Sequence, residues 1–390
     1  MKYIIITLIM ASLLVGSCTK PEVLPADYYT CQLPFVDSSS SHPNDLAYQN
    51  ILERSQKLGA VGVSVMIKDE HGVWLGTAGM ADIANNVQLQ PCHSMFIASI
   101  TKVFTSSMIY TFIEDGILSL DDYVKDWIDA TTLKKLANAD KAQIKHLLSH
   151  TSGIPDYYTT SYDMMRMNAY YNGLSHEETL KFAKGLKAYN EVGEGYRYCN
   201  TNYLLLGMIM EAASGKNLSE LFDSRIFNPM QFESAVYGGE NPIPDGVAKG
   251  YVDIYGDGKF VESMFLYKDE LNTADGGIAI NAYETGRFFE KLLKGEVISS
   301  ESLSTMLNSF ELPDGRWDPK YHPLHGAYGI EKFITPNGVA YGHTGSIMGF
   351  SSVVQYFPDL DKTFVMIVNS SSYNDDPQEE IYNACMELMF

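Results

Sequence analysis

The strand-like segments lie at the two ends of the chain, and this distribution constrains the fold more than any other feature of the sequence. Near the N-terminus, two apolar runs at residues 61–68 and 73–79 flank the turn sequence Asp-Glu-His-Gly. Near the C-terminus, further runs of this kind follow in pairs around turn signals, at residues 328–334, 339–342, 351–357 and 363–368. Strands at both ends predict one sheet that is built from both termini.

The stretch between these strands is patterned as helix. After Ser99, apolar residues recur at helical spacing as one stripe, and Ser175 with Glu178 forms a capping box. The predicted helices begin near residues 44, 99, 175, 202 and 378. We therefore expect an α/β (α+β) architecture with a mixed, largely antiparallel sheet, flanking helices and a helical lobe inserted at about residues 99–270. The cleft between sheet and helices is the natural place for a site.

The first residues have the pattern of a bacterial export signal. Lys2 precedes an apolar run at residues 3–15, and Val15-Gly16-Ser17-Cys18 resembles a lipobox, in which the cysteine is lipidated. We expect residues 1–17 to be a lipoprotein signal peptide and Cys18 to carry a lipid that anchors the protein to a membrane of the bacterial cell envelope. The alternative is an ordinary secretory signal that happens to contain a cysteine.

The segment that follows is expected to be a tether. Residues 18–43 contain several prolines, the run Ser38–Ser41 and little periodicity, so the folded domain is predicted to span residues 44–390. The cysteines after the lipobox are scattered, at positions 31, 92, 199 and 385. Their spacing indicates neither a zinc site nor a disulfide framework, although export would permit a disulfide.

The overall charge excludes one class of partner. The formal net charge is -20 at pH 7, whereas nucleic-acid binding requires a basic surface. A net negative charge favours solubility but does not indicate a substrate.

The first chemical motif is Ser99-Ile100-Thr101-Lys102. If Ser99 opens the predicted helix, Lys102 lies one turn later on nearly the same face. A helix N-terminus favours developing negative charge, and a nearby amine lowers the cost of deprotonating the serine. The spacing alone carries little information, because Ser17 and Lys20 have it too.

Two further motifs have matching chemistry. Tyr198 can pass a proton if a cationic neighbour depresses its pKa from about 10, and the Asn200 amide can bind a substrate carbonyl. His343-Thr344-Gly345 directly follows a predicted strand. The glycine would let a substrate backbone approach the strand edge, and the next amide can face an oxyanion.

Order and context together give these motifs their meaning. The stretches at residues 96–102, 146–155, 195–203 and 343–345 resemble the class C β-lactamase-like serine hydrolases. That family includes D-Ala-D-Ala carboxypeptidases, D-amino-acid peptidases and carboxylesterases. The resemblance extends from about residue 44 to the C-terminus and implies a β-lactamase/transpeptidase-like fold. Tyr-x-Asn in place of the second lactamase element, S-D-N, is typical of the class C branch.

The resemblance implies a role for each site residue. Ser99 would attack a carbonyl to give an acyl-enzyme, with general-base and proton-return work shared by Lys102 and Tyr198. Asn200 would orient the substrate amide, and the oxyanion would lie between the backbone amides of Ser99 and Ser346. This chemistry needs neither metal nor cofactor. The remaining predicted substrate-binding residues are His343, Thr344 and Gly345.

His343 stands where the lactamases carry a lysine. A lysine is charged at neutral pH and attracts the carboxylate of penicillins and D-Ala-D-Ala peptides, whereas a histidine with a pKa near 6.5 is mostly neutral. We therefore expect weak β-lactam hydrolysis beside activity on esters or on amides without that carboxylate. Activity on carboxylate substrates should rise as pH falls through the pKa of His343.

Other interpretations remain open. His146 and His150 have a metal-ligand spacing, but no third ligand accompanies them, so no metal is expected. Residues 157–171, rich in tyrosine and methionine, would form either a rim over the cleft or packing within the helical lobe. The alternative function is a silent module that binds penicillin or a peptidoglycan fragment without turnover. Neither the substrate nor the oligomeric state can be inferred from the sequence.

Overall fold

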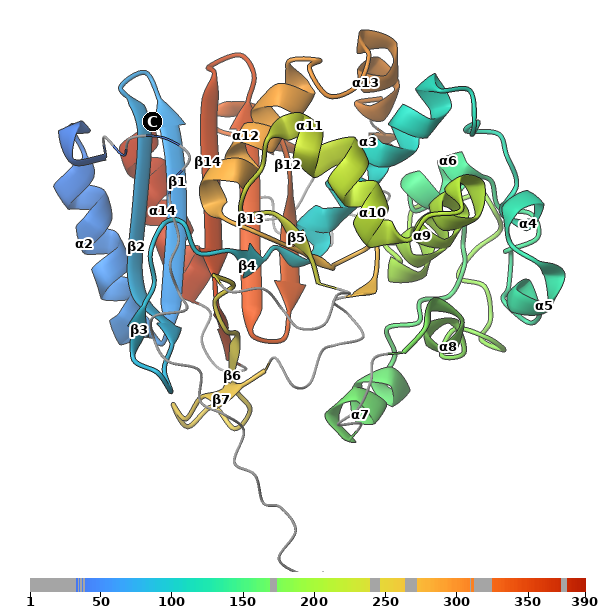
Figure 1. The fold of residues 1–390 in the computed structure, drawn as a ribbon, viewed down its shortest axis with the longest axis horizontal. Coiled ribbons are helices and arrows are strands. Elements are labelled where there is room, and N and C mark those ends of the chain that lie inside the picture. The colour runs from blue at the N-terminus through green and yellow to red at the C-terminus, as the bar shows by residue number, and fades with distance from the viewer. Residues whose placement is uncertain are drawn as a thin grey trace, which may run out of the picture.

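The computed structural model describes residues 39–168, 174–238, 246–263, 272–308, 310–311, 325–372 and 377–390, together with positions 33, 35 and 37. Within them the chain forms a sheet lobe and a helical lobe side by side (Figure 1). Both helices and a largely antiparallel sheet are present, which confirms the predicted fold class.

A nine-stranded sheet is the frame of the molecule, in the order β3-β2-β1-β14-β13-β12-β11-β10-β9. Strand β1 pairs antiparallel with β14, with Val65 opposite Met366, so the first and last long strands lie side by side (Figure 1). The prediction of one sheet from both termini is therefore confirmed. The strands are β1 Gly62–Asp69, β2 Gly72–Asp82, β3 Val87–Gln88, β9 Phe310–Glu311, β10 His325–Gly326, β11 Glu331–Thr335, β12 Gly338–Ile347, β13 Phe350–Phe357 and β14 Lys362–Val368.

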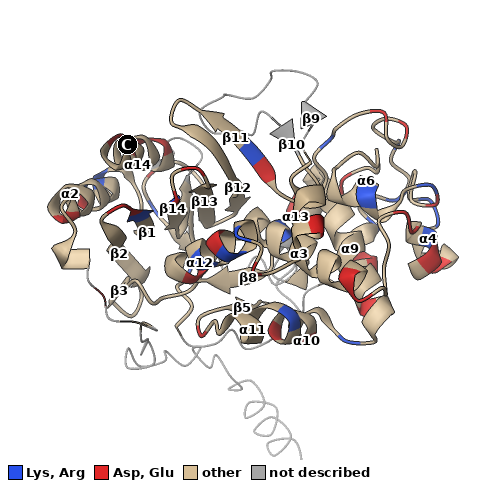
Figure 2. Cartoon of the chain, turned by 90° about the horizontal axis from the view of Figure 1, so that it is seen from above, with Lys and Arg blue, Asp and Glu red and all other residues tan. Residues whose placement is uncertain are grey.

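Side-chain alternation gives the sheet two different apolar faces. In β1, Val63, Val65 and Ile67 belong to the core under one face, whereas Met66 belongs to the core under the other. Helices α2 (Asp45–Ser55) and α14 (Pro377–Met389) cover the first face, and α12 (Ala282–Leu293) covers the second. Figure 2 shows the sheet between these two layers. Both faces are buried, and this explains the nearly continuous apolar runs of the central strands.

The helical lobe packs beside the second face. Its elements are the 3-10 helix η4 (Ala98–Ile100), α3 (Thr101–Glu114), α4 (Val124–Trp127), α5 (Ala130–Leu133), α6 (Ile144–Leu148), α7 (Thr160–Asn168), α8 (His176–Leu180), α9 (Asn200–Ser214), α10 (Leu218–Phe222), the π-helix η5 (Asp223–Phe227) and α11 (Asn228–Met230). The expected apolar stripe of α3 is in fact a helix buried on all sides from Thr101 to Tyr110. The lobe ends earlier than residue 270, since strands follow Met230.

Smaller elements join the two lobes. One three-stranded sheet contains β4 (Met95–Phe96), β8 (Ile278–Ile280) and β5 (Val236–Tyr237), and another contains β15 (Ser370–Ser372), β6 (Tyr251–Asp253) and β7 (Val261–Glu262). The remaining short helices are η2 (Ser39–Ser41), η3 (Gln56–Leu58) and α13 (Ser300–Met306). Strand β4 leads directly into η4, so it fixes where α3 begins.

The described part of the predicted tether packs on the domain. Phe35 lies 4.1 Å from Tyr283 between ring centroids, and the Leu75 amide donates to Ser39 Oγ at 2.7 Å. His42 is buried and its Nε2 lies 3.1 Å from an Asp69 oxygen. The domain boundary at residue 43 stays a prediction, although these contacts join part of the predicted tether to the domain. Residues 1–17 and Cys18 lie outside the described residues.

Two observations bear on the cell envelope. Cys92 forms a disulfide whose partner lies outside the described residues, whereas Cys199 and Cys385 are free and buried. Among the helices of the described ranges, none has the length and apolarity required to cross a membrane.

Candidate active site

Ser99 lies in the tight turn that starts α3, at the junction of the two lobes. The preceding residue, Ala98, has a φ of 49°, a left-handed conformation that is uncommon outside glycine. Strands β12 and β13 hold this turn: Ser352 Oγ donates to the Ile97 carbonyl at 2.8 Å. A Cβ on Gly345 would lie 2.2 Å from that carbonyl oxygen, so the glycine allows β12 to approach the turn. Gly345 thus makes room for the serine turn, and its predicted role in letting a substrate backbone approach stays a prediction.

Lys102 contacts the serine directly. Its Nζ lies 2.9 Å from Ser99 Oγ and 2.8 Å from the backbone carbonyl oxygen of Asp275. The lysine side chain is only 1% exposed. Burial lowers the pKa of Lys102 below the usual lysine value, against the opposing attraction of Asp275. The lowered pKa makes the neutral amine, whose lone pair can accept the serine proton, easier to populate than in an exposed lysine.

Tyr198 reaches the same serine with its phenol. It hydrogen-bonds to Ser99, and Lys102 Nζ lies 5.1 Å from the centroid of its ring. Burial raises the pKa of Tyr198 well above its usual range, and the hydrogen bond with Ser99 offsets only part of this. Proton transfer by Tyr198 was expected on the condition of a depressed pKa, whereas burial shifts the pKa upward because it disfavours the phenolate. The protonated phenol is a proton donor here.

The segment before α7 supports Tyr198 and the residues next to it. The His150 ring stacks on Tyr198 with centroids 4.5 Å apart, and His150 Nδ1 accepts the Cys199 amide at 3.1 Å. Burial lowers the pKa of His150 well below its usual value, so the ring is neutral. No cluster able to hold a metal ion occurs among the residues that the structure describes. His150 is therefore a support for the tyrosine, a role that its spacing from His146 did not indicate.

Asn200 is held by a carboxylate that the sequence analysis missed. Asp156 Oδ2 accepts from the Asn200 side-chain amide at 3.1 Å and from its backbone amide at 3.2 Å. Asp156 follows the His146–Pro155 stretch directly, and this adjacency was the available signal. The contact fixes which way the Asn200 amide faces at the start of α9.

His343 is less titratable than expected. Its Nδ1 donates to the Thr344 carbonyl, and its Nε2 lies 3.6 Å from an oxygen of Glu331. Burial lowers the pKa of His343 to about 3, and the charge of Lys102 acts in the same direction. The ring is therefore neutral throughout the ordinary pH range, so the predicted rise of carboxylate activity on protonation of His343 would occur only at acid pH and stays a prediction.

Glu331 is the group that titrates in this part of the cleft. It lies on β11 opposite Gly342 of β12, which places its side chain beside His343. Burial raises the pKa of Glu331 to about 8, although a hydrogen bond from the Thr344 backbone and the charge of Lys102 oppose the shift. The acid is neutral at pH 7. The position of Glu331 beside His343 follows from the register of β11 on β12, which the sequence alone does not indicate.

The other predicted site residues lie along β12. Thr344 is half-buried, and Ser346 is exposed opposite Ser351 of β13. Since β12 packs on η4, the backbone of Ser346 and that of Ser99 belong to one packed unit.

The aromatic segment 157–171 divides into two parts. Tyr157 and Tyr162 are fully buried, and Tyr157 donates to the carboxylate of Asp275 at 2.9 Å. Tyr158 and Met164 are 39% and 62% exposed. Residues 169–171 lie outside the described residues. Packing within the lobe thus accounts for part of this segment.

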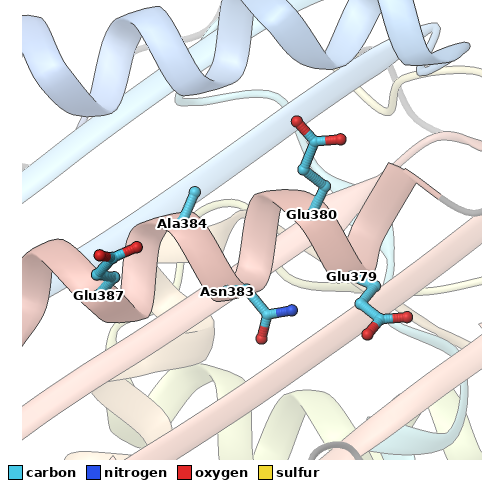
Figure 3. Close-up of a pocket in the computed structure, with 5 residues that line it drawn as sticks. All are labelled: Glu379, Glu380, Asn383, Ala384 and Glu387. Atoms are coloured by element: carbon cyan, nitrogen blue, oxygen red, sulfur yellow. The ribbon is translucent and has the colours of Figure 1, made fainter.

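A shallow hollow of about 520 Å³ lies elsewhere, on the outer surface of α14 (Figure 3). Glutamates line it, and Glu380 pairs with Arg54 of α2 at 2.7 Å. It lies on the sheet face opposite Ser99, so it takes no part in the site.

Comparison with known proteins identifies similar sequences and folds. The sequence profile of the beta-lactamase family matches residues 48–384. Penicillin-binding protein 4* of Bacillus subtilis is 25% identical, covering 80% of this chain and 68% of that protein. Protein flp of Staphylococcus aureus is 24% identical, covering 83% of this chain and 62% of that protein. The chain thus spans about two thirds of the length of these relatives.

A solved structure shares the fold. D-amino acid amidase from Ochrobactrum anthropi SV3 superimposes with a TM-score of 0.75 at 24% identity. The match covers 89% of this chain and 99% of the amidase.

Proposed function

We propose that this chain, which belongs to the beta-lactamase family, is a serine hydrolase that cleaves an ester or amide through an acyl-enzyme on Ser99. The observation that carries the proposal is the 2.9 Å contact between Ser99 Oγ and a buried Lys102 amine whose pKa is lowered. A general base must lie within hydrogen-bond reach of the proton that it removes, and Lys102 does.

The geometry supports an order of proton transfers. Lys102 takes the hydroxyl proton of Ser99 while Oγ forms a bond to the substrate carbonyl carbon, whose π electrons move to oxygen. The bond to the leaving group then breaks as the Tyr198 phenol protonates that group. Lys102 passes its proton on to the Tyr198 phenolate. Water hydrolyses the acyl-enzyme by the same transfers, with Ser99 regaining its proton.

The oxyanion is assigned to backbone amides. In this proposal the amides of Ser99 and Ser346 donate to the carbonyl oxygen as it gains charge. The close packing of Gly345 on Ile97 supports the assignment, because it brings β12 next to the serine turn. Asn200, set by Asp156, and Thr344 orient the rest of the substrate.

The neutral His343 supports a preference for substrates without a carboxylate. An imidazole with a pKa of about 3 offers no positive charge to a penicillin or to a D-Ala-D-Ala terminus. Small esters and amides, including D-amino-acid amides of the kind named for the structural neighbour, fit the site better.

A panel assay tests the proposal. Purified protein would be given a chromogenic cephalosporin, short-chain p-nitrophenyl esters, D-amino-acid amides and D-Ala-D-Ala peptides, and labelled with a fluorophosphonate. We expect labelling and hydrolysis that Ser99→Ala abolishes. Full hydrolysis by Ser99→Ala would contradict the mechanism. Binding of a penicillin without turnover or labelling would instead show a silent binding module.

We also propose export and lipid anchoring at Cys18. The lipobox-like residues 15–18 carry the proposal, and the disulfide at Cys92 supports an oxidising compartment. Wild-type protein should fractionate with membranes, and Cys18→Ala should not. A mature N-terminus at another residue, without diacylglycerol in the mass spectrum, would refute it.

A further inference from the structure

Lys102 is joined to Asp275 by two atoms of the same residue. The amine contacts the Asp275 backbone oxygen at 2.8 Å and lies 3.7 Å from carboxylate Oδ2. Both side chains are buried, with exposures of 1% and 8%. A carboxylate so close to the lysine beside Ser99 is not part of the motifs that identified the site.

The loop that carries Asp275 is fixed to α3 on both sides of this contact. Thr105 Oγ1 donates to the Ala274 carbonyl at 2.6 Å, and the Ile278 amide donates to Thr101 Oγ1 at 3.2 Å. The residues that hold the loop are therefore on the helix that carries Lys102. The distance between amine and carboxylate is set by packing rather than by a flexible side chain.

Tyr157 fixes the carboxylate itself. Its hydroxyl donates to Asp275 Oδ2 at 2.9 Å from the fully buried start of the aromatic segment. Among the described residues, the other oxygen, Oδ1, is buried with no hydrogen-bond partner. A buried carboxylate held by one phenol and facing one amine is costly to maintain, which argues that its charge serves the amine.

Other groups also face Lys102. The acidic groups that oppose the lowering of the Lys102 pKa are Asp275, Asp156, Glu331 and Cys199, of which Asp275 has the largest influence. The rings of Tyr198 and Tyr203 lie 5.1 and 5.7 Å from the amine, and His150 and His343 face it as neutral imidazoles. Asp275 is the nearest full charge of opposite sign in this set.

We propose that Asp275 is a positioning residue for Lys102, whose carboxylate stabilises the ammonium that forms when Lys102 takes the Ser99 proton, and that Tyr157 holds this carboxylate in place. The inference rests on the proposed function. The transfer moves one proton from Ser99 Oγ to Lys102 Nζ, so a buried neutral amine becomes a buried cation. Asp275 receives no proton and supplies only charge.

The pH profile distinguishes this role from a structural one. Acylation needs the neutral amine, so kcat/KM rises with pH through the pKa of Lys102. Loss of the Asp275 charge lowers that pKa and shifts this rising limb to lower pH, by about one unit or more. The plateau falls as well, roughly ten-fold, because a weaker base and an unpaired ammonium slow the transfer. Damage to folding alone would lower the whole profile without moving it.

The experiment measures kcat/KM for a neutral p-nitrophenyl ester, and the rate of fluorophosphonate labelling, from about pH 5 to 10. Asp275→Asn should shift the rising limb of the profile to lower pH. Tyr157→Phe leaves the charge but removes the donor that holds the carboxylate in place, so the rising limb should also shift to lower pH, by less than in Asp275→Asn. The double variant should match Asp275→Asn, because Tyr157 acts through Asp275.

The matched control is Asp82→Asn, which removes a buried carboxylate 3.4 Å from Lys249, outside the site. Its limb should stay in place. Unmoved limbs in Asp275→Asn and Tyr157→Phe, with an active wild type, would overturn the inference. If Asp275→Asn does not fold, a rising limb of Tyr157→Phe that is unmoved or shifted to higher pH overturns the inference alone. A wild type that neither labels nor hydrolyses would instead refute the proposed function.

Discussion

The two faces of the central sheet differ in what they bury. Beneath α2 and α14 the buried apolar cluster includes Tyr48, Leu52 and Phe364, and the buried Gln355 accepts a hydrogen bond from Tyr382. On the other face, around the start of α3, Lys102 and His343 are buried as well, together with the unpaired oxygen of Asp275. Burial stabilises both faces and raises the pKa of Tyr48 to about 12 on the first, but only on the second does it change the proton affinities of groups beside Ser99. The same physical effect therefore serves stability on both sides and chemistry on one.

The largest loss of activity should come from Lys102→Ala, on the polar face of the sheet. We expect this variant to lower kcat about 10²–10⁴-fold, the usual range for a proton-transfer group. Tyr198→Phe should lower kcat by an amount at the lower end of that range. Steady-state hydrolysis of the best panel substrate measures the change in kcat. Activity within a factor of about three of wild type would assign the base elsewhere.

A substitution on the apolar face should have the opposite effect. Leu52 is fully buried, and Leu52→Ala should lower the free energy of unfolding by about 2–5 kcal/mol. The kcat of the folded protein should stay unchanged, since α2 lies across the sheet from Ser99. Urea denaturation and active-site titration report the two quantities separately. A matching loss of kcat would show that the faces are coupled.

His343→Lys should sharpen the comparison by adding a charge to the polar face. A charged hydrogen bond to a substrate carboxylate is worth about 1–3 kcal/mol, so the ratio of cephalosporin to ester kcat/KM should rise roughly ten- to hundred-fold at pH 7. Wild-type turnover of the cephalosporin far above that of the ester would defeat the premise that the neutral imidazole disfavours carboxylates.

The smallest expected effect concerns Glu331. Its pKa is about 8 in the folded protein and near 4.5 when unfolded, so the folded state binds more protons between these values. Stability should therefore decline as pH rises from about 5 to 8, and Glu331→Gln should flatten this slope. Above pH 8 the carboxylate also appears beside His343, so wild type alone should lose activity on anionic substrates relative to esters. Thermal melts and paired rate profiles at pH 5 and 9 test both.

Much of the fold and the central triad could be predicted because their signals are local. The helix near residue 44, the paired C-terminal strands and the capping box at Ser175 each have their own sequence pattern, and all are present. The structure also brings Ser99, Lys102 and Tyr198 together, as their order in the chain suggested.

The rest depends on contacts between distant segments. Asp275 lies 173 positions from Lys102, and Glu331 meets His343 only through the register of β11 on β12. The pKa values of Tyr198 and His343 were judged from their residue types, whereas burial decides them. The end of the lobe was misplaced because the strands after Met230 are only two or three residues long.

The pairing of β1 with β14 also determines when the central sheet can form during synthesis. Val63 lies opposite Val368, so the central sheet cannot close until nearly the whole chain has left the ribosome. Contacts of such long sequence separation slow folding, since a large loop must close before they form. The turn at Ser99 is clamped by β12 and β13, which are made late, so the nascent chain has its nucleophile long before it has a working site. The site around Ser99 is therefore assembled only after β12 and β13 have been synthesised.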